Sequence, residues 1–393
     1  MNNAIYNNPT KVLFGKGMEN ELGAALKGKA SRALLHYGSE RVRESGLLKR
    51  VRASLESAGI TCFELGGVKG NPFLSLVYKG IDVCRENNVD LVVGVGGGSV
   101  IDSAKAIACG APNGQNDVWA YYTGRGALVA EKILPVATVL TIPGAGSESS
   151  TGSVVTNEKT QEKLDYNDER LRPVVSVLNP ELTYTIPVYH TAAGVADAIA
   201  HVMERYFTHT AYVDTTDRMC EGVIRTLIKY GKRVLGEPEN YDVRAEVMWA
   251  CKVAHDGTLG VGRQEEWTSH MIEHELSAKY DVSHGAGLAV IYPAWMQMVY
   301  PAGKERFAQF AMRVFDVEYD FADVDNTVRK GIARLKHFFK SIGMPVSLKE
   351  LGVKDDGDIE DMVKRYTAHN GEKTGAFMEL TAADIEKILK SAL

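Results

Sequence analysis

The chain has 393 residues, of which 45% are hydrophobic and 24% charged, so it is long enough for two domains and has an ordinary globular composition. Its net charge of -5 argues against nucleic acid or an anionic membrane as the main partner and favours small molecules. The five scattered cysteines form no CxxC pair, and neither a secretory signal nor a run of about 20 apolar residues is visible, so we expect a cytoplasmic protein with reduced thiols.

The first half of the chain alternates β-rich runs with helical stretches. Helical spacing of apolar residues predicts helices over residues 46–58 and 74–86. Strands are predicted at residues 31–37, 61–65, 90–95, 135–142 and 174–178. This alternation indicates βαβ units and a mostly parallel sheet, to which residues 11–15 are expected to add an antiparallel strand.

The pattern changes after about residue 185, where strand signals nearly vanish. Long helices are predicted at residues 191–207, 216–235, 243–258, 265–278, 285–299, 304–314 and 324–342. The sequence therefore predicts an α/β dinucleotide-binding domain over residues 1–185 and an all-α metal- and substrate-binding domain over residues 186–393.

A glycine turn between a predicted strand and a predicted helix is the candidate phosphate loop. Backbone N–H groups at Gly96, Gly97, Gly98 and Ser99 can cradle a pyrophosphate at the start of a helix. The match to GxGxxG is imperfect because Ser99 holds the third glycine position. Taken alone, the stretch is equally consistent with a plain glycine turn.

The turn after the predicted strand at 31–37 bears on cofactor choice. An acidic residue at the end of this strand favours the free ribose of NAD, and here the position is Gly38. Arg41 and Arg43 follow closely, and a guanidinium suits the 2′-phosphate of NADP. Glu40 lies in the same turn, so a solvated charged turn is the alternative.

Carboxylate and imidazole groups at metal-ligand spacing occur in the second half. Asp197 and His201 lie four apart in an apolar helical stretch, so both project from one face. His270 and His274 repeat this spacing, and His284 begins another predicted helix. Such a donor set suits Fe(II) or Zn(II), although spacing alone leaves open which three histidines bind. The HExxH pattern of metalloproteases is not met.

The remaining histidines have no partner at ligand spacing and are expected to be surface or satisfied core residues: His36, His190, His209, His255, His337 and His369. Four side chains are candidate linings of an apolar substrate pocket, although such residues are more often plain core: Trp267, Phe207, Tyr166 and Met271.

Several motifs together resemble the iron-containing (group III) alcohol dehydrogenases, especially the NADPH-dependent butanol dehydrogenase and aldehyde reductase branch. The similar motifs are PTKVLFGKG at 9–17, NP at 71–72, GGGSVID at 96–102, TIPGAGSES at 141–149, NPELT at 179–183, GVADAIAH at 194–201 and HMIEHELSAKYDVSHGAG at 270–287. The resemblance implies that Asp197, His201, His270 and His284 bind the metal and that the non-ligand His274 relays a proton. It also implies a set of cofactor-binding residues, namely Gly38, Ser39, Arg41, Asn71, Gly96, Gly97, Gly98, Ser99, Asp102, Thr141, Ser147, Ser150 and Lys163. Residues 39–41 depart from the glycine- and serine-rich turn of the family.

The resemblance implies hydride transfer between NADP(H) and a primary alcohol or aldehyde such as butanol or butyraldehyde, with one Fe(II) or Zn(II) ion and a homodimeric assembly. Two alternatives remain. A polyol (glycerol-type) dehydrogenase shares the chemistry, and a cyclase similar to dehydroquinate synthase shares the architecture. The second is disfavoured because the residues around the ligands are mostly Ala, Val, Glu and Thr and lack the basic groups that a phosphorylated substrate needs.

Overall fold

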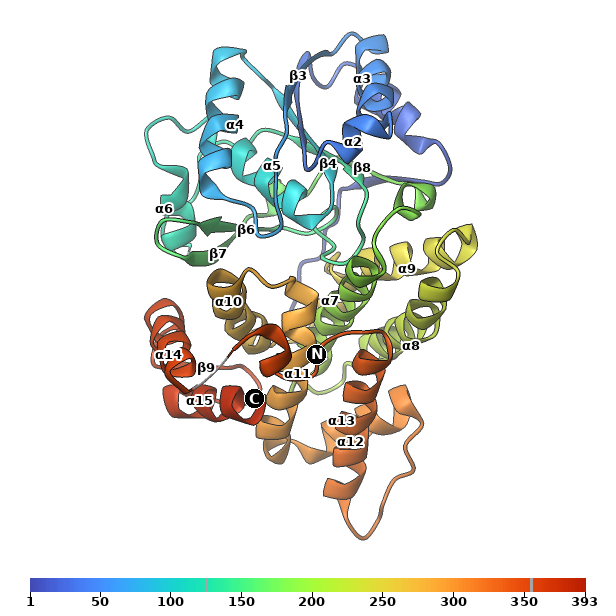
Figure 1. The fold of residues 1–393 in the computed structure, drawn as a ribbon, viewed down its shortest axis with the longest axis vertical. Coiled ribbons are helices and arrows are strands. Elements are labelled where there is room, and N and C mark those ends of the chain that lie inside the picture. The colour runs from blue at the N-terminus through green and yellow to red at the C-terminus, as the bar shows by residue number, and fades with distance from the viewer. Residues whose placement is uncertain (125, 354–355) are drawn as a thin grey trace. The chain divides into compact units, whose positions relative to one another are not determined.

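The structure is a computed structural model that describes residues 1–124, 126–353 and 356–393. The chain divides into two compact units, Asn7–Ile186 and Pro187–Leu393, and the first six residues, Met1–Tyr6, belong with the second unit. Figure 1 shows the α/β unit in blue to green and the helical unit in green to red. Each unit is described separately below.

The α/β unit is built on a six-stranded sheet in the order β1-β8-β5-β4-β2-β3, with every pair of neighbours parallel. Its strands are β1 Lys11–Phe14, β2 Arg32–Tyr37, β3 Thr61–Leu65, β4 Leu91–Gly96, β5 Val136–Leu140 and β8 Val175–Leu178. The parallel sheet expected from the sequence is confirmed. The expected antiparallel strand is wrong, because β1 pairs parallel with β8. Some 160 residues of chain separate these two strands, so no hairpin imposes an antiparallel direction.

Helices cover both faces of this sheet, as strands that are buried on both sides require. In β2, Ala33, Leu35 and Tyr37 join the core on the side of α1 and α3, whereas Leu34 joins the core on the side of α4, α5 and α6. Figure 1 shows α3 and α4 on opposite sides of the strands. The helices of this unit are α1 Leu22–Leu26, α2 Arg41–Glu44, α3 Leu47–Ser57, α4 Leu74–Glu86, α5 Gly98–Gly110 and α6 Val118–Thr123.

An antiparallel hairpin of β6 (Gly152–Asn157) and β7 (Glu162–Asn167) follows β5, and the sequence did not predict it. Its strands are largely polar, so they lack the apolar alternation that identifies a strand. Tyr166 on β7 packs with Tyr121 and Tyr122 in the core of this unit and is therefore a core residue, not a pocket lining.

The second unit is helical around one large core. Its helices are α7 Val188–Tyr206, α8 Asp214–Gly236, α9 Tyr241–Ala254, α10 Thr268–Tyr280, α11 His284–Val299, α12 Lys304–Phe315, α13 Val324–Ser341, α14 Asp356–Asn370 and α15 Ala382–Ser391. The sequence did not predict α14 or α15. A ribbon of β9 (Lys373–Thr374) and β10 (Leu380–Thr381) also makes this unit slightly less than all-α.

Helix α7 lies at the centre of the helical unit. Every residue of the stretch 191–206 is buried, and α7 packs against α8 and α11. Phe207, directly after it, stacks on Phe307 within the core and is not a pocket lining. A helix buried all round can carry charged side chains only where partners compensate for the lost hydration.

In the described parts of the chain, no helix is long and apolar enough to cross a membrane.

Candidate metal centre and nucleotide loop

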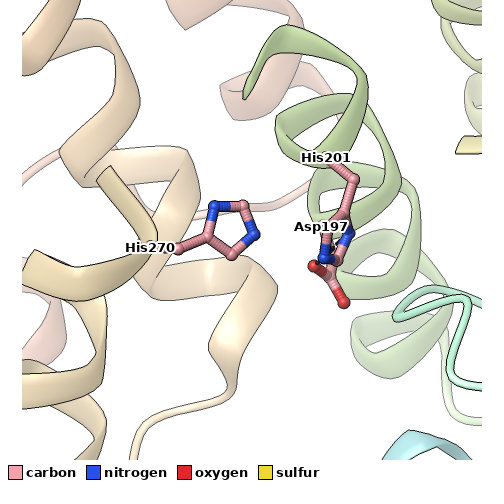
Figure 2. Close-up of side chains that lie close together, drawn as sticks. All are labelled: Asp197, His201 and His270. Carbon is pink, nitrogen blue, oxygen red and sulfur yellow. Dashed lines mark ion pairs between the residues drawn. The ribbon is translucent and has the colours of Figure 1, made fainter. Parts of the chain in front are cut away.

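Helix α7 presents a carboxylate and an imidazole on one face of its buried turns. Asp197 and His201 are one helical turn apart, and Asp197 Oδ1 lies 3.1 Å from His201 Nδ1. Both side chains are almost completely buried. In Figure 2 they point from α7 toward His270, which projects from α10.

Helix α10 supplies the third group. The His270 ring lies 4.6 Å from the His201 ring, centroid to centroid. One ligand atom from each of Asp197, His201 and His270 lies within 4.8 Å of the others, a spacing that a single ion can bridge. The buried His270 Nε2 has no hydrogen-bond partner among the described residues. Because buried polar atoms are almost always satisfied, this atom is well suited to a ligand that the protein alone does not supply.

His284 is the first residue of α11 and approaches the same site. Its Nε2 lies 3.9 Å from Asp197 Oδ1, and its ring lies 5.3 Å from the His270 ring. His274, one turn after His270 on α10, has its ring 5.7 Å from His284. Glu273, His274 and His284 form a second group with ligand atoms within 4.8 Å of one another. The structure thus brings the five residues singled out in the sequence into one cluster.

Burial favours the metal-binding form of two of these histidines. Burial lowers the pKa of His201 and lowers that of His270 well below its ordinary value. Repulsion from the neighbouring imidazoles lowers the His270 pKa further. A neutral imidazole has a free lone pair and is the metal-binding form of histidine. The donor set of imidazole nitrogens and one carboxylate therefore fits Fe(II) or Zn(II).

Two further aromatic residues adjoin the cluster. The half-buried His255 has its ring 4.1 Å from that of His201, so it adjoins the cluster although it has no partner at ligand spacing in the sequence. The ring of Trp267 lies 5.1 Å from that of His270 and 5.7 Å from that of His255, and the Arg205 guanidinium lies over it. His255 follows α9 and has no ligand at helical spacing, so no sequence signal connects it to the site.

The candidate nucleotide loop lies at the end of β4. The strand ends at Gly96, and α5 begins at Gly98 after the extended Gly97. Within the described chain no side chain caps this helix start, which leaves backbone N–H groups for an anion. A Cβ on Gly98 would lie 2.7 Å from Ala145 Cβ, so glycine is required for the segment after β5 to lie against the turn.

Gly38 and this loop lie side by side at the carboxyl ends of two neighbouring strands, β2 and β4. Tyr37 of β2 pairs with Val95 of β4, so Gly38 follows β2 where Gly96 ends β4. From these neighbouring strands the chain proceeds to β3 on one side and to β5 on the other. This is the topological switch point at which parallel α/β sheets bind their ligands.

The other expected cofactor residues lie in the same unit. Thr141 follows β5, and its N–H donates to the Gly96 carbonyl over 3.0 Å. Asp102 on α5 is engaged within the unit, because its carboxylate accepts from Ser147 Oγ at 2.5 Å and from the Val154 N–H at 3.2 Å. The remaining residues are Ser39 and Arg41 after β2, Asn71 before α4, Ser150 before β6 and Lys163 on β7. Their contacts with a cofactor stay a prediction.

Comparisons with known proteins agree with this architecture. Residues 9–180 match the family model of iron-containing alcohol dehydrogenase, and residues 191–393 match that of the C-terminal part of Fe-containing alcohol dehydrogenases. The chain belongs to the iron-containing alcohol dehydrogenase family. The resemblance inferred from the sequence motifs is therefore confirmed.

Relatives of this family match over the full length of the chain. The NADH-dependent butanol dehydrogenase A of Clostridium acetobutylicum is 37% identical over 98% of both proteins. The NADPH-dependent aldehyde reductase YqhD of Escherichia coli is 35% identical over 100% of both. The crystal structure of NADH-dependent butanol dehydrogenase A from Thermotoga maritima is 38% identical, with a TM-score of 0.95 over 100% of this chain and 99% of that one.

Proposed function

We propose that this protein is a cytoplasmic, metal-dependent alcohol dehydrogenase or aldehyde reductase that uses NADP(H) and acts on primary alcohols and aldehydes such as butanol and butyraldehyde. The observation that carries the proposal is the buried cluster of one carboxylate and three imidazoles in a chain of the iron-containing alcohol dehydrogenase family. The named relatives, two butanol dehydrogenases and an aldehyde reductase, support the substrate class and a nicotinamide cofactor.

In this proposal Asp197, His201, His270 and His284 hold one divalent ion, Fe(II) or Zn(II). When bound, such an ion supplies a Lewis acid for the substrate oxygen, and the nicotinamide supplies or accepts the hydride. The buried side chains of Asp197, His201 and His270 exclude water from the site, and together with the partly exposed His284 they would hold the ion that orients the oxygen. His274, next to His284, accepts or donates the hydroxyl proton at its imidazole.

The preference for NADP is supported by the turn after β2. Arg43 is engaged by Tyr37, by Glu64 at 2.8 Å and by Glu40 at 3.2 Å. Arg41 is exposed and its guanidinium makes no hydrogen bond or ion pair among the described residues, so this group is available for a 2′-phosphate. Relatives of both preferences exist, since two are named NADH-dependent and one NADPH-dependent.

The cofactor proposal predicts that Arg41→Ala raises the KM for NADPH about 10-fold or more and leaves the KM for NADH unchanged, because a hydrogen bond to a charged group contributes roughly 1.5–3 kcal/mol. Arg43→Ala is the matched control and should leave the NADPH/NADH ratio near that of the wild type. Gly38→Asp should shift the preference toward NADH. A Cβ at Gly38 would meet Val100 and the Val68 carbonyl only at ordinary contact distance, 3.5 Å, so the fold should persist. Unchanged ratios in the Arg41 and Gly38 variants would refute this interpretation of the turn.

The whole proposal is tested with protein stripped by a chelator and reloaded anaerobically with Fe(II), or with Zn(II). Oxidation of NADPH or NADH is followed with butyraldehyde, and reduction of NADP+ or NAD+ is followed with glycerol in the reverse direction. We expect metal-dependent turnover of butyraldehyde, faster with NADPH; a preference for glycerol would instead favour the polyol dehydrogenase alternative.

A matched pair of histidine variants separates the metal site from a general loss of structure. His270→Ala should lose metal binding and turnover together, whereas His337→Ala, an exposed histidine of the same unit, should keep both. A metal-free His270→Ala protein with full activity would refute the site.

We also propose a homodimer. The first residues carry no helix or strand, and the side chain of Ile5 is fully exposed, as expected for a segment that contacts a second copy. Light scattering after size exclusion should give twice the chain mass, and deletion of residues 2–6 should weaken the dimer. A monomeric wild-type protein would refute the assembly.

A further inference from the structure

A carboxylate stands behind the ring of His270 on the side opposite its unpaired nitrogen. Glu204, one turn beyond His201 on α7, lies with Oε1 2.5 Å from His270 Nδ1 and also accepts the His270 backbone N–H at 3.3 Å. Its other oxygen accepts the Tyr292 hydroxyl at 3.1 Å. Glu204 has no exposed surface, and its contacts fix the orientation of the His270 ring.

A second carboxylate holds His284 in the same manner. The Nδ1–H of His284 donates to Glu273 Oε2, and the hydroxyl of Ser277 donates to Glu273 Oε1. Glu273 is fully buried on α10. A Cβ on Gly287 of α11 would lie 2.7 Å from the Glu273 side chain, so a glycine at that position makes room for this contact.

We propose, resting on the metal function proposed above, that Glu204 and Glu273 are positioning residues that set the tautomer and aim of two ligand imidazoles. A histidine whose Nδ1–H is donated to a carboxylate presents the lone pair of Nε2 in the opposite direction and becomes a stronger donor. The Nε2 of His270 has no hydrogen-bond partner among the described residues, and the Nε2 of His284 lies 3.9 Å from Asp197 Oδ1.

Charge gives an independent reason for this role. Buried carboxylates are costly unless a positive charge compensates for them, and Glu204 and Glu273 are fully buried behind the rings of His270 and His284. A divalent ion on the far side of the same rings offsets both charges through the imidazoles. If the two glutamates served only to satisfy buried histidines, their replacement would lower the stability of the metal-free protein without changing its metal affinity.

The chain offers a matched control on α10. Glu275 is also buried, at 5% exposure, and it accepts from the Nδ1 of a histidine, His369, at 2.8 Å. That histidine lies on α14 and is not a proposed ligand. The variants Glu275→Gln and Glu273→Gln therefore remove the same charge from the same helix, and only one of them acts through the metal site.

The experiment measures Zn(II) affinity by competition with a chromophoric chelator, with Co(II) absorption spectra as a report of ligand geometry. We expect Glu204→Gln and Glu273→Gln to weaken Zn(II) binding roughly 10- to 100-fold and to change the Co(II) spectrum. Glu273→Ala should bind Zn(II) more weakly than Glu273→Gln, because alanine also removes the carbonyl acceptor that glutamine keeps. Glu275→Gln should keep the wild-type affinity, whatever its effect on the thermal midpoint of the metal-free protein.

Wild-type affinity and Co(II) spectra in all three variants of Glu204 and Glu273, with affinity lost in His270→Ala, would overturn the positioning role and leave the metal site intact. Failure of the wild-type protein itself to bind Zn(II), Co(II) or Fe(II) would instead overturn the proposed function and this inference with it.

Discussion

The glycine at the start of α5 provides a sharp test of the nucleotide loop. In Gly98→Ala the added methyl group would lie 2.7 Å from Ala145 Cβ, whereas ordinary contacts are 3.4–4 Å, so the turn or the segment after β5 must move. Overpacking of this kind costs about 1–3 kcal/mol. If the strain falls on the geometry that binds the pyrophosphate, nucleotide affinity falls roughly 5- to 150-fold.

The assay is a fluorescence titration with NADPH and with NADH, together with a thermal unfolding curve and a measurement of bound metal. Both nucleotides should weaken equally, because they share the pyrophosphate, and metal content should not change. Gly114→Ala is the control, since a methyl group there would meet only the Arg85 guanidinium at 3.9 Å. Unchanged nucleotide affinity in Gly98→Ala would refute the assignment of this turn.

Three further predictions concern stability. Burial lowers the pKa of His36 to about 4, so below pH 6.5 the unfolded chain binds a proton that the folded protein does not. The free energy of unfolding should therefore fall by about 2 kcal/mol between pH 7 and pH 5. In urea unfolding, His36→Gln should reduce this difference between the two pH values, and an unchanged difference would count against the prediction. Glu266→Ala should lower the free energy of unfolding by about 3 kcal/mol, because the buried Glu266 carboxylate accepts the backbone N–H groups of Ala376 and Phe377 at 2.7 and 2.6 Å. A thermal midpoint equal to that of the wild type would contradict this prediction. Calorimetry of the wild-type protein should give a free energy of unfolding about 3 kcal/mol lower without metal than with the free ion at 100 times its Kd. Removal of the metal with a chelator should leave the stability of His270→Ala unchanged.

Local sequence patterns determined the architecture of this protein. Alternation of apolar runs with helical spacing identified five strands of the sheet, and the glycine-rich turn fell between a strand and a helix as expected. The pairs Asp197/His201 and His270/His274 were recognisable because a helix brings residues four apart onto one face. These features depend on neighbours in the chain, so the sequence carries them directly.

Only the tertiary structure decided the features that depend on distant residues. The direction of β1 follows from its pairing with β8, at the other end of the unit. In the sequence, Glu204 and Glu273 cannot be distinguished from ordinary charged residues of a helix. The packing of α7, α10 and α11 brings their carboxylates to the histidine rings. His255 likewise reaches His201 from a loop 54 residues away. Burial turns such side chains into parts of a site, and burial is a property of the packed core rather than of the local sequence.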